Sequence, residues 1–277
     1  MKNIQFTESP GVPHASMEED FLTHKKCSEW WYCTGYLNDE TGRMFSFQFT
    51  LARLKVFGIR FHLLLTALTD FQTGKHYCEQ KTAFFGKNII TTADKTAFGD
   101  KAEITYSKNQ FASRDRMQLR MKGKNFSVNV DMNAVKPPVW HCDNGVLQMG
   151  VLDDLKQTTF YYSYTNLAST GKIVLADKEY NVKGKSWFDK QGGTYTITNR
   201  WVNWEWFSMR FFDGEEVMLF AFPQDNYYDG TFIGKTGDYR RPNDYVIKPI
   251  GFTQAGGYKF SNGWTLSMKG VKGEEYT

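Results

Sequence analysis

Apolar and polar side chains alternate along most of this chain, in short runs that end at turn residues. The run at residues 45–51 is the clearest, because every second residue in it is apolar and these residues would share one face of a strand. Gly, Asn and Asp collect between the runs, as they do where strands reverse direction. The pattern therefore predicts antiparallel β-sheets.

Four hairpin turns follow from these runs. Two turns in the first half open with Asp and close with Thr-Gly, at residues 39–42 and 70–74. A third is expected at residues 169–171, and a fourth at the Asp-Gly pair 213–214, where a type I′ turn would need positive φ. No long stretch has the 3.6-residue apolar period of a helix, so the sequence argues against a parallel α/β fold.

The 277 residues suffice for two β domains. The best candidate boundary lies near residues 176–184, so we expect one domain at residues 1–180 and a second at 181–277. No Pro- or Ser-rich linker separates them, which predicts that they pack tightly. Residues 272–277 have the form of a turn into another strand. The second domain is therefore expected to be incomplete at its C-terminus, or to close its sheet differently.

Composition and charge exclude some classes of partner. Apolar residues make up 41% of the chain and aromatic residues 17%, enough for a sizeable core. The net charge of +4 is scattered, whereas a nucleic-acid-binding protein concentrates its basic residues on one stripe, so we expect no nucleic-acid partner. No apolar run approaches the roughly twenty residues of a membrane helix, so we expect no integral membrane segment.

The cysteines and the N-terminus bear on the compartment. Cys27, Cys33, Cys78 and Cys142 form no CxxC pair. Our interpretation is four free, buried thiols in a reducing compartment. Because residues 1–6 contain no apolar h-region, we expect a cytoplasmic protein; an exported one would need a signal peptide ahead of residue 1.

Several common active sites are missing from the sequence. It contains no GxSxG elbow, P-loop, GxGxxG or HExxH motif. The five histidines are isolated from one another along the chain, at positions 14, 24, 62, 76 and 141. We therefore expect neither a metal nor a cofactor.

The first informative segment is residues 29–37. On a strand, Glu29 and Trp31 would share one face, and Trp30 would lie on the other. A buried carboxylate needs a partner, which His24 or an arginine could supply. The alternative is an aromatic core strand in which Glu29 anchors a loop.

The second segment is residues 185–193, in which Trp187, Asp189 and Gln191 would align on one face of a strand. An acid beside an indole can have its pKa raised by desolvation and then donate a proton. Alternatively, Asp189 fixes a turn at residues 191–193 through a side-chain hydrogen bond. The residues alone leave both interpretations open.

The third segment is residues 201–207. Asn203 and Glu205 alternate there with aromatic residues on one face. Polar groups between aromatic rings suit a ligand cavity, and they also suit a strand whose second face is wet.

Taken together, these segments resemble the family of the AttH proteins and the carotenoid hydratases, such as hydroxyneurosporene synthase, which is related to lipocalin-like Diels–Alderases. His24 and residues 29–37 are similar to the motif H…EWWYxxGxL, and residues 136–145 to KPP…G(D/N)G. Three further motifs, YYYS, GxxWxDxxxG and WxWFxxxLxDGxxLM, are similar to residues 161–163, 184–193 and 204–218. The five motifs stand in the family's order.

The resemblance implies an all-β fold of two lipocalin-like or β-sandwich domains packed together, with an apolar pocket at or between them. Family members hydrate an isolated double bond in carotenoids, and related fungal proteins accelerate intramolecular Diels–Alder closures of polyenes. Asp189 falls on the position of the family's motif acid, and Trp187 on the aromatic residue before it. The family often has an aromatic residue three positions after the acid, where this chain has Gly192.

Our leading hypothesis is an enzyme, a hydratase or a cyclase, that acts on an apolar polyene or terpenoid-like molecule in isoprenoid or polyketide biosynthesis. In hydration, Asp189 would protonate an alkene and the rings of Trp187 and Trp31 would stabilise the cation. In cyclisation, Gln191 or a protonated Glu29 would polarise a carbonyl group.

Asp189 is thus the candidate catalytic residue. The candidate substrate-binding residues are Trp187, Gln191, Glu29, Trp31, Tyr162, Asn203 and Glu205. The rival hypothesis is a non-catalytic lipocalin-like carrier of a lipid or pigment, in which no acid is directed into the pocket. A hydrolase has less support, because no nucleophile–base pair is visible.

Overall fold

The chain divides into two compact units, residues 1–201 and residues 202–277. The boundary expected at residue 180 lies inside a strand, and the hairpin near it joins two strands of the first unit. The computed structural model describes residues 21–24, 27–56, 58–84, 89–92, 94–107, 115–142, 144–149, 157–193, 204–223, 227–242, 245–269 and 275–276.

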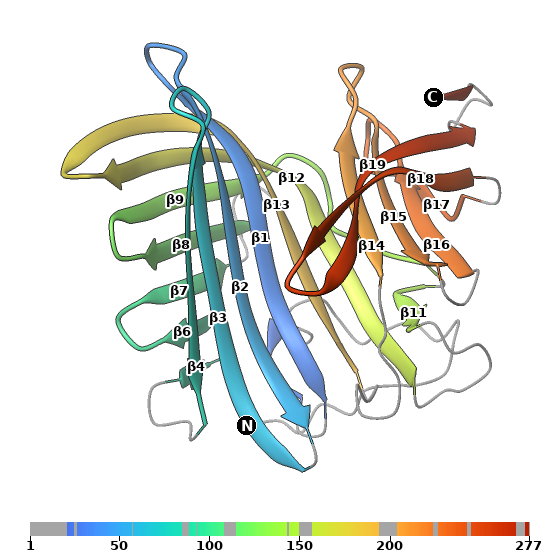
Figure 1. The fold of residues 1–277 in the computed structure, drawn as a ribbon, viewed down its shortest axis with the longest axis horizontal. Helices are drawn as coiled ribbons and strands as arrows, with labels where there is room; N and C mark the ends of the chain where they lie inside the picture. Colours follow the sequence, from blue (N-terminus) through green and yellow to red (C-terminus); the bar gives the residue numbers. More distant parts are fainter. Residues whose placement is uncertain are drawn as a thin grey trace. The chain divides into compact units, whose positions relative to one another are not determined.

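Among the described residues of the first unit, thirteen strands form one antiparallel sheet. They are β1 (Ser28–Asp39), β2 (Met44–Val56), β3 (Ile59–Asp70), β4 (Lys75–Ala83), β5 (Ile89–Thr91), β6 (Lys95–Phe98), β7 (Ala102–Ser107), β8 (Arg116–Lys122), β9 (Phe126–Ala134), β10 (Val139–Trp140), β11 (Val146–Gln148), β12 (Thr158–Leu175) and β13 (Lys178–Gly193). The order across the sheet is β4-β3-β2-β1-β13-β12-β9-β8-β7-β6-β5, and β10 and β11 pair with β12 beside this path. Figure 1 shows β4, β3, β2, β1 and β13 side by side in this order.

This sheet curls around one apolar core. Buried and exposed residues alternate along β9 and β1, as expected for strands with one face turned inward. The rings of Tyr77 on β4 and Phe126 on β9 lie 6.5 Å apart between centroids, although these strands are far apart in the sheet order. Both belong to the same core as Phe45, Phe47 and Phe49, which confirms the predicted apolar face of residues 45–51.

The two turns that open with Asp are confirmed. Asp39 accepts hydrogen bonds from the backbone N–H groups of Thr41 (2.8 Å) and Arg43 (2.9 Å), and Gly42 has φ of 86°. Asp70 accepts a hydrogen bond from the hydroxyl of Thr73 at 2.6 Å. In each turn the aspartate satisfies local donors that the strands leave unpaired.

The turn predicted at residues 169–171 is wrong, because β12 runs unbroken from Thr158 to Leu175. The chain reverses instead at Ala176 and Asp177, with φ of 49° and 66°. Two successive positive φ values are the signature of a type I′ turn, whose twist matches the flanking strands. The sequence misled because neither residue is a glycine.

The second unit contains two antiparallel sheets, which share an apolar core that includes Val217, Phe232 and Ile247. The predicted hairpin at residues 213–214 is present, but only Gly214 has positive φ, so the type I′ turn expected there is wrong. The strands are β14 (Glu205–Arg210), β15 (Glu216–Phe222), β16 (Tyr227–Ile233) and β17 (Tyr239–Arg240) in one sheet, and β18 (Tyr245–Ala255), β19 (Tyr258–Lys269) and β20 (Glu275–Tyr276) in the other.

All four cysteines are reduced thiols, and three of them are buried. Cys78 on β4 is exposed, so the prediction of four buried thiols is wrong at this position. Within the described ranges, no helix is long and apolar enough to cross a membrane.

Candidate active site

The central strands of the first unit divide the predicted site residues between two faces. Residues that lie directly opposite each other on paired strands point to the same side of a sheet. Asp189 on β13 lies between Tyr32 on β1 and Ser163 on β12, and the next residue, Lys190, lies between Trp31 and Tyr162. Consequently Asp189 and Lys190 point to opposite sides of the sheet.

We call the two sides the Asp189 face and the core face. Trp187, Asp189 and Gln191 lie on the Asp189 face, as the alternation in the sequence predicted. Glu29, Trp31 and Tyr162 lie on the core face, which is also the face of Lys190. The structure therefore does not bring together all the residues that the sequence placed in one pocket.

Residues 191–193 are extended. Gln191 and Gly193 belong to β13 and pair with Trp30 and Ser28 of β1. The alternative interpretation, in which Asp189 fixes a turn at these residues, is therefore wrong.

Asp189 is buried within a cluster of hydrogen-bond donors. Its Oδ1 accepts a hydrogen bond from Nε1 of Trp187 at 2.5 Å and another from the hydroxyl of Ser163. The hydroxyl of Tyr161 also donates to its carboxyl group. The side chains of Asp189, Trp187, Ser163 and Tyr161 are each at most 5% exposed.

The environment of Asp189 changes its acidity. Burial raises the pKa of its carboxyl group from 3.8 to about 7, although the donors Ser163, Trp187 and Tyr161 act in the opposite direction. A carboxyl group that is removed from water loses the hydration that stabilises its charge. Asp189 can therefore both hold and release a proton near neutral pH.

His141 extends this cluster. Its Nε2 lies 2.7 Å from Oγ of Ser163, so Ser163 links His141 to Asp189. The imidazole ring is parallel to the indole of Trp187, with 6.4 Å between centroids. Its side chain is fully buried, and burial lowers the pKa of His141 to about 3. The imidazole is therefore neutral across the physiological range.

A tight backbone turn positions His141. Its N–H donates to the carbonyl of Tyr161 (3.0 Å), and its carbonyl accepts from the N–H of Gly145 (2.7 Å). Cys142 and Asn144 have positive φ, at 57° and 49°. Non-glycine residues in this region each cost about 1–3 kcal/mol, and such conformations cluster at functional sites.

Gln191 is engaged within the protein. Its Nε2 donates to Oγ1 of Thr159 at 2.8 Å and lies 3.6 Å from the sulfur of Met149. The side-chain amide that we expected to polarise a substrate carbonyl group therefore already donates to a protein residue on the Asp189 face.

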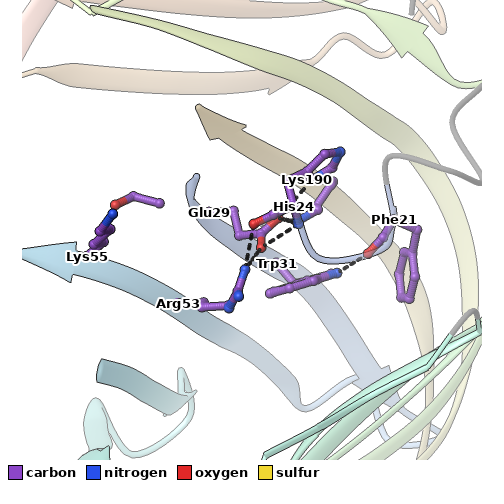
Figure 2. A network of polar contacts seen from close by, with 8 residues as sticks. Phe21, His24, Glu29, Trp31, Arg53, Lys55 and Lys190 are labelled. Atoms are coloured by element: carbon purple, nitrogen blue, oxygen red, sulfur yellow. Dashed lines mark hydrogen bonds and ion pairs between the residues drawn. The ribbon is translucent and has the colours of Figure 1, made fainter. Parts of the chain in front are cut away.

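On the core face, Glu29 forms a buried ionic network (Figure 2). Its Oε2 lies 2.8 Å from Nζ of Lys190 and 3.0 Å from Nδ1 of His24, and its Oε1 lies 2.8 Å from Nη1 of Arg53. The prediction that His24 or an arginine would pair with Glu29 is confirmed. Lys190 was not predicted.

Glu29 is held in its charged form. Burial acts to raise the pKa of Glu29, but the charge of Lys190, with the hydrogen bond and charge of His24, outweighs it and lowers the pKa to about 2. A protonated Glu29 that polarises a carbonyl is therefore excluded near neutral pH.

Trp31 and Tyr162 are part of the core of the first unit. Lys190 places its Nζ 3.6 Å from the ring centroid of Trp31, and Nε1 of Trp31 donates to the carbonyl of Phe21 at 2.9 Å (Figure 2). This lysine already supplies a cation to the indole ring. Trp187 lies on the Asp189 face and Trp31 on the core face. A single substrate cation therefore cannot contact both rings, as the hydration hypothesis expected.

Two predicted residues lie near the start of the second unit. Asn203 lies outside the described residues. Glu205 begins β14 and pairs with Ala221, which is in the apolar core of this unit. Oε2 of Glu205 is buried and has no hydrogen-bond partner among the described residues. Glu205 belongs to the second unit and Asp189 to the first.

The sequence interpretation missed Ser163 and His141. Both lie inside motifs quoted for the resemblance, Ser163 in residues 161–163 and His141 in residues 136–145. They are 22 positions apart, and Ser163 is 26 positions from Asp189, so only the pairing of β10, β12 and β13 brings them together. Across the described part of the chain, no three His, Cys, Asp or Glu residues are grouped to hold a metal ion.

Comparison with solved structures shows the fold. An AttH protein of Nitrosomonas europaea is 22% identical with a TM-score of 0.80, covering 95% of this chain and 84% of its own. Kievitone hydratase of Nectria haematococca is 18% identical with a TM-score of 0.70, covering 87% and 73%. A structure of CghA with Sch210972 is 7% identical with a TM-score of 0.56, covering 98% and 80%.

No curated protein matches the sequence. The model of the AttH-like family matches residues 10–275, a range that includes every motif and most of each unit described above. The chain therefore belongs to the AttH-like family.

Proposed function

We propose that this chain is an enzyme that adds water to, or closes a ring in, an apolar polyene or terpenoid-like small molecule, with Asp189 as the source of the proton. The observation that carries the proposal is the hydrogen-bonded chain of Asp189, Ser163 and His141 on the Asp189 face. Aromatic rings of Trp187 and Tyr161 flank this chain.

The chemistry of alkene protonation favours such a group. An alkene is a weak base, so it needs an acid that is protonated near neutral pH and little hydrated. Burial gives Asp189 both properties, since it raises the pKa of the carboxyl group to about 7. Aromatic faces beside the acid can stabilise the cation that protonation creates.

Structural neighbours support the reaction class. Kievitone hydratase has the same fold and is named for the addition of water. The motifs of the first unit are also similar to those of carotenoid hydratases, which act on polyenes. Both similarities favour hydration, and the similarity to carotenoid hydratases is our reason for proposing a polyene as the substrate.

The proposal can be tested with two probes, an acyclic carotenoid polyene and kievitone, each incubated with the full chain in D₂O. Hydration would give a product heavier by one water with one deuterium bound to carbon, detected by mass spectrometry. Proton-initiated cyclisation would give an isomer with one deuterium on carbon in place of the hydrogen lost on ring closure, so it would be one mass unit heavier than the substrate and have a different retention time.

The variant Asp189→Asn should slow the conversion by at least about 100-fold, which is the lower end of what a positioned acid contributes. Glu103→Gln, which changes a partly exposed carboxylate on β7 that pairs with Lys95, is the matched control and should leave the rate unchanged. Conversion by Asp189→Asn at the wild-type rate would overturn the role of Asp189. A probe bound by the chain in native mass spectrometry without turnover would favour the carrier instead.

A further inference from the structure

One ring nitrogen of His141, Nδ1, is a buried polar atom that no described residue pairs by a hydrogen bond. Its side chain has no exposed surface, and its Nδ1 has no hydrogen-bond partner among the residues that the structure describes. Buried polar atoms are nearly always paired, because an unpaired one loses the hydrogen bond that it would make with water. This atom lies at the end of the hydrogen-bonded chain from Asp189, which points to a ligand as its partner.

We propose that Nδ1 of His141 is the atom that exchanges a proton with the substrate, and that Asp189 supplies this proton through Ser163. The inference rests on the proposed function, because it specifies how the acid of that reaction reaches the alkene. It makes His141 a catalytic residue and Ser163 a relay between two catalytic groups.

The surroundings of Asp189 explain why its own oxygens would not contact the substrate. Trp187, Ser163 and Tyr161 all direct donors at the carboxyl group. An indole N–H can only donate, so Oδ1 always accepts from Trp187. The carboxyl group is therefore enclosed by protein donors, and its proton has a ready path through the hydroxyl of Ser163.

The relay has two states that differ by one proton. In the charged state, Ser163 donates to Asp189, Nε2 of His141 donates to Ser163, and Nδ1 carries only a lone pair. In the protonated state, Asp189 donates to Ser163, Ser163 donates to Nε2, and Nδ1 carries the hydrogen. The imidazole is neutral in both states, which agrees with its lowered pKa of about 3.

The forward step is balanced in atoms and electrons. The Nδ1–H bond breaks as the π electron pair of the alkene forms a new C–H bond, which leaves a cationic carbon. The hydrogen of Ser163 moves to Nε2, and the proton of Asp189 moves to Ser163. Water then adds its lone pair to the cationic carbon, and one of its protons returns to Nδ1, which reverses the relay.

Other titratable groups face Asp189 from its neighbouring elements. They are Tyr32 on β1, Tyr161 on β12 and His141 after β10. Burial raises the pKa of Tyr32, and Asp189 raises it further, so this phenol stays neutral. Lys190 and Glu29 lie on the core face, so Asp189 is the group whose charge changes near neutral pH.

The tautomer of His141 tests the relay without any substrate. In the full chain labelled with ¹⁵N at histidine, the Nδ1–H tautomer should dominate at about pH 5 and the Nε2–H tautomer at about pH 9. The Asp189→Asn variant should hold the Nε2–H tautomer at both, because its carbonyl oxygen accepts from Trp187 and Ser163. A His141 that keeps one tautomer throughout in the wild type overturns the inference, whether or not the chain converts a polyene.

Activity on the carotenoid probe supplies the second test. In a His141→Gln variant, the side-chain amide can take the place of Nε2 and reach Ser163, but no atom takes the place of Nδ1. The shorter amide of an asparagine could take the place of Nδ1 only. His141→Gln should therefore lower kcat by at least about 100-fold with little change in KM. Ser163→Ala, a small change that cuts the relay, should lower kcat and remove the pH dependence of the tautomer. If Asp189→Asn is inactive while His141→Gln keeps the wild-type kcat, the proposed function stands and the role of His141 is wrong.

Discussion

Nζ of Lys190 lies 2.8 Å from Oε2 of Glu29, and neither side chain has any exposed surface. Two charges so deeply buried are stable only together, since each would be strongly disfavoured alone in a medium of low polarity. The two residues are 161 positions apart on β13 and β1, so the pair connects distant parts of the chain.

Removing one partner should therefore destabilise the first unit. We expect Glu29→Gln to lower the free energy of unfolding by about 3–5 kcal/mol, because it leaves Lys190 buried without its counter-charge. Guanidinium denaturation followed by tryptophan fluorescence measures the change. Glu79→Gln, which breaks the partly exposed pair of Glu79 and Lys81, is the control and should cost less than about 1 kcal/mol. An equal effect of the two substitutions would contradict this account of the pair.

The same carboxylate predicts a pH dependence. The pKa of Glu29 is about 2 in the folded chain against an ordinary value of 4.5, so its contribution to stability is present above pH 4.5 and is lost as the pH falls toward 2. The stability difference between the wild type and Glu29→Gln should shrink over this window. Denaturation curves of both proteins at several acidic pH values test it, and a difference that stays constant would refute the lowered pKa.

Alternation along single strands was predictable from the sequence, whereas the register between strands was not. The period of two placed Trp187, Asp189 and Gln191 on one face, and the structure confirms it. The assignment of Trp31 to the same pocket failed, because the face on which Trp31 lies depends on the register between β1 and β13, in which Tyr32 pairs with Asp189. A shift of this register by one residue would move every side chain of β1 to the opposite face. Nothing within β1 or β13 alone determines that shift.

The hydrogen-bond partners of Asp189 illustrate a second limit. An isolated histidine and a serine within a tyrosine-rich run carry no local signal, so the sequence could not join His141 and Ser163 to Asp189. The partners of Glu29 were partly predictable, because a buried carboxylate requires a cation and His24 and the arginines were available.

Asp189 should act on stability in the opposite direction to Glu29. Its pKa is raised from 3.8 to about 7, so the folded chain holds a proton that the unfolded chain has released between these values. The free energy of unfolding therefore falls as the pH rises through this range. The Asp189→Asn protein escapes this loss, and by pH 8 it should have gained roughly 2–4 kcal/mol relative to the wild type. Chemical denaturation across this range checks it, and parallel stability curves would show that Asp189 ionises normally.

Gly192 is expected to be intolerant of a side chain. A Cβ atom there would lie 2.5 Å from Cβ of Glu29 and 3.1 Å from the ring of Phe160. The close neighbours of Gly192 on the core face therefore explain why this chain has a glycine where the family often has an aromatic residue. Gly192→Ala should lower the free energy of unfolding by about 1–3 kcal/mol through overpacking. Gly263→Ala is the matched control, because its nearest contact would be 3.4 Å away. Equal stability of the two variants in thermal denaturation would contradict the packing around Glu29.

The exposure of the cysteines gives a test that needs no substitution. A thiol reacts with Ellman's reagent only when solvent reaches its sulfur atom, and Cys78 is the exposed cysteine of β4. The native chain should therefore release one equivalent of chromophore rapidly, and the remaining thiols, those of Cys27, Cys33 and Cys142, should react only in denaturant. A Cys78→Ser variant should lose the rapid phase and keep the slow one. Rapid reaction of two or more thiols in the native protein would mean that the core around Cys33, or the turn that holds His141 beside Cys142, opens to solvent.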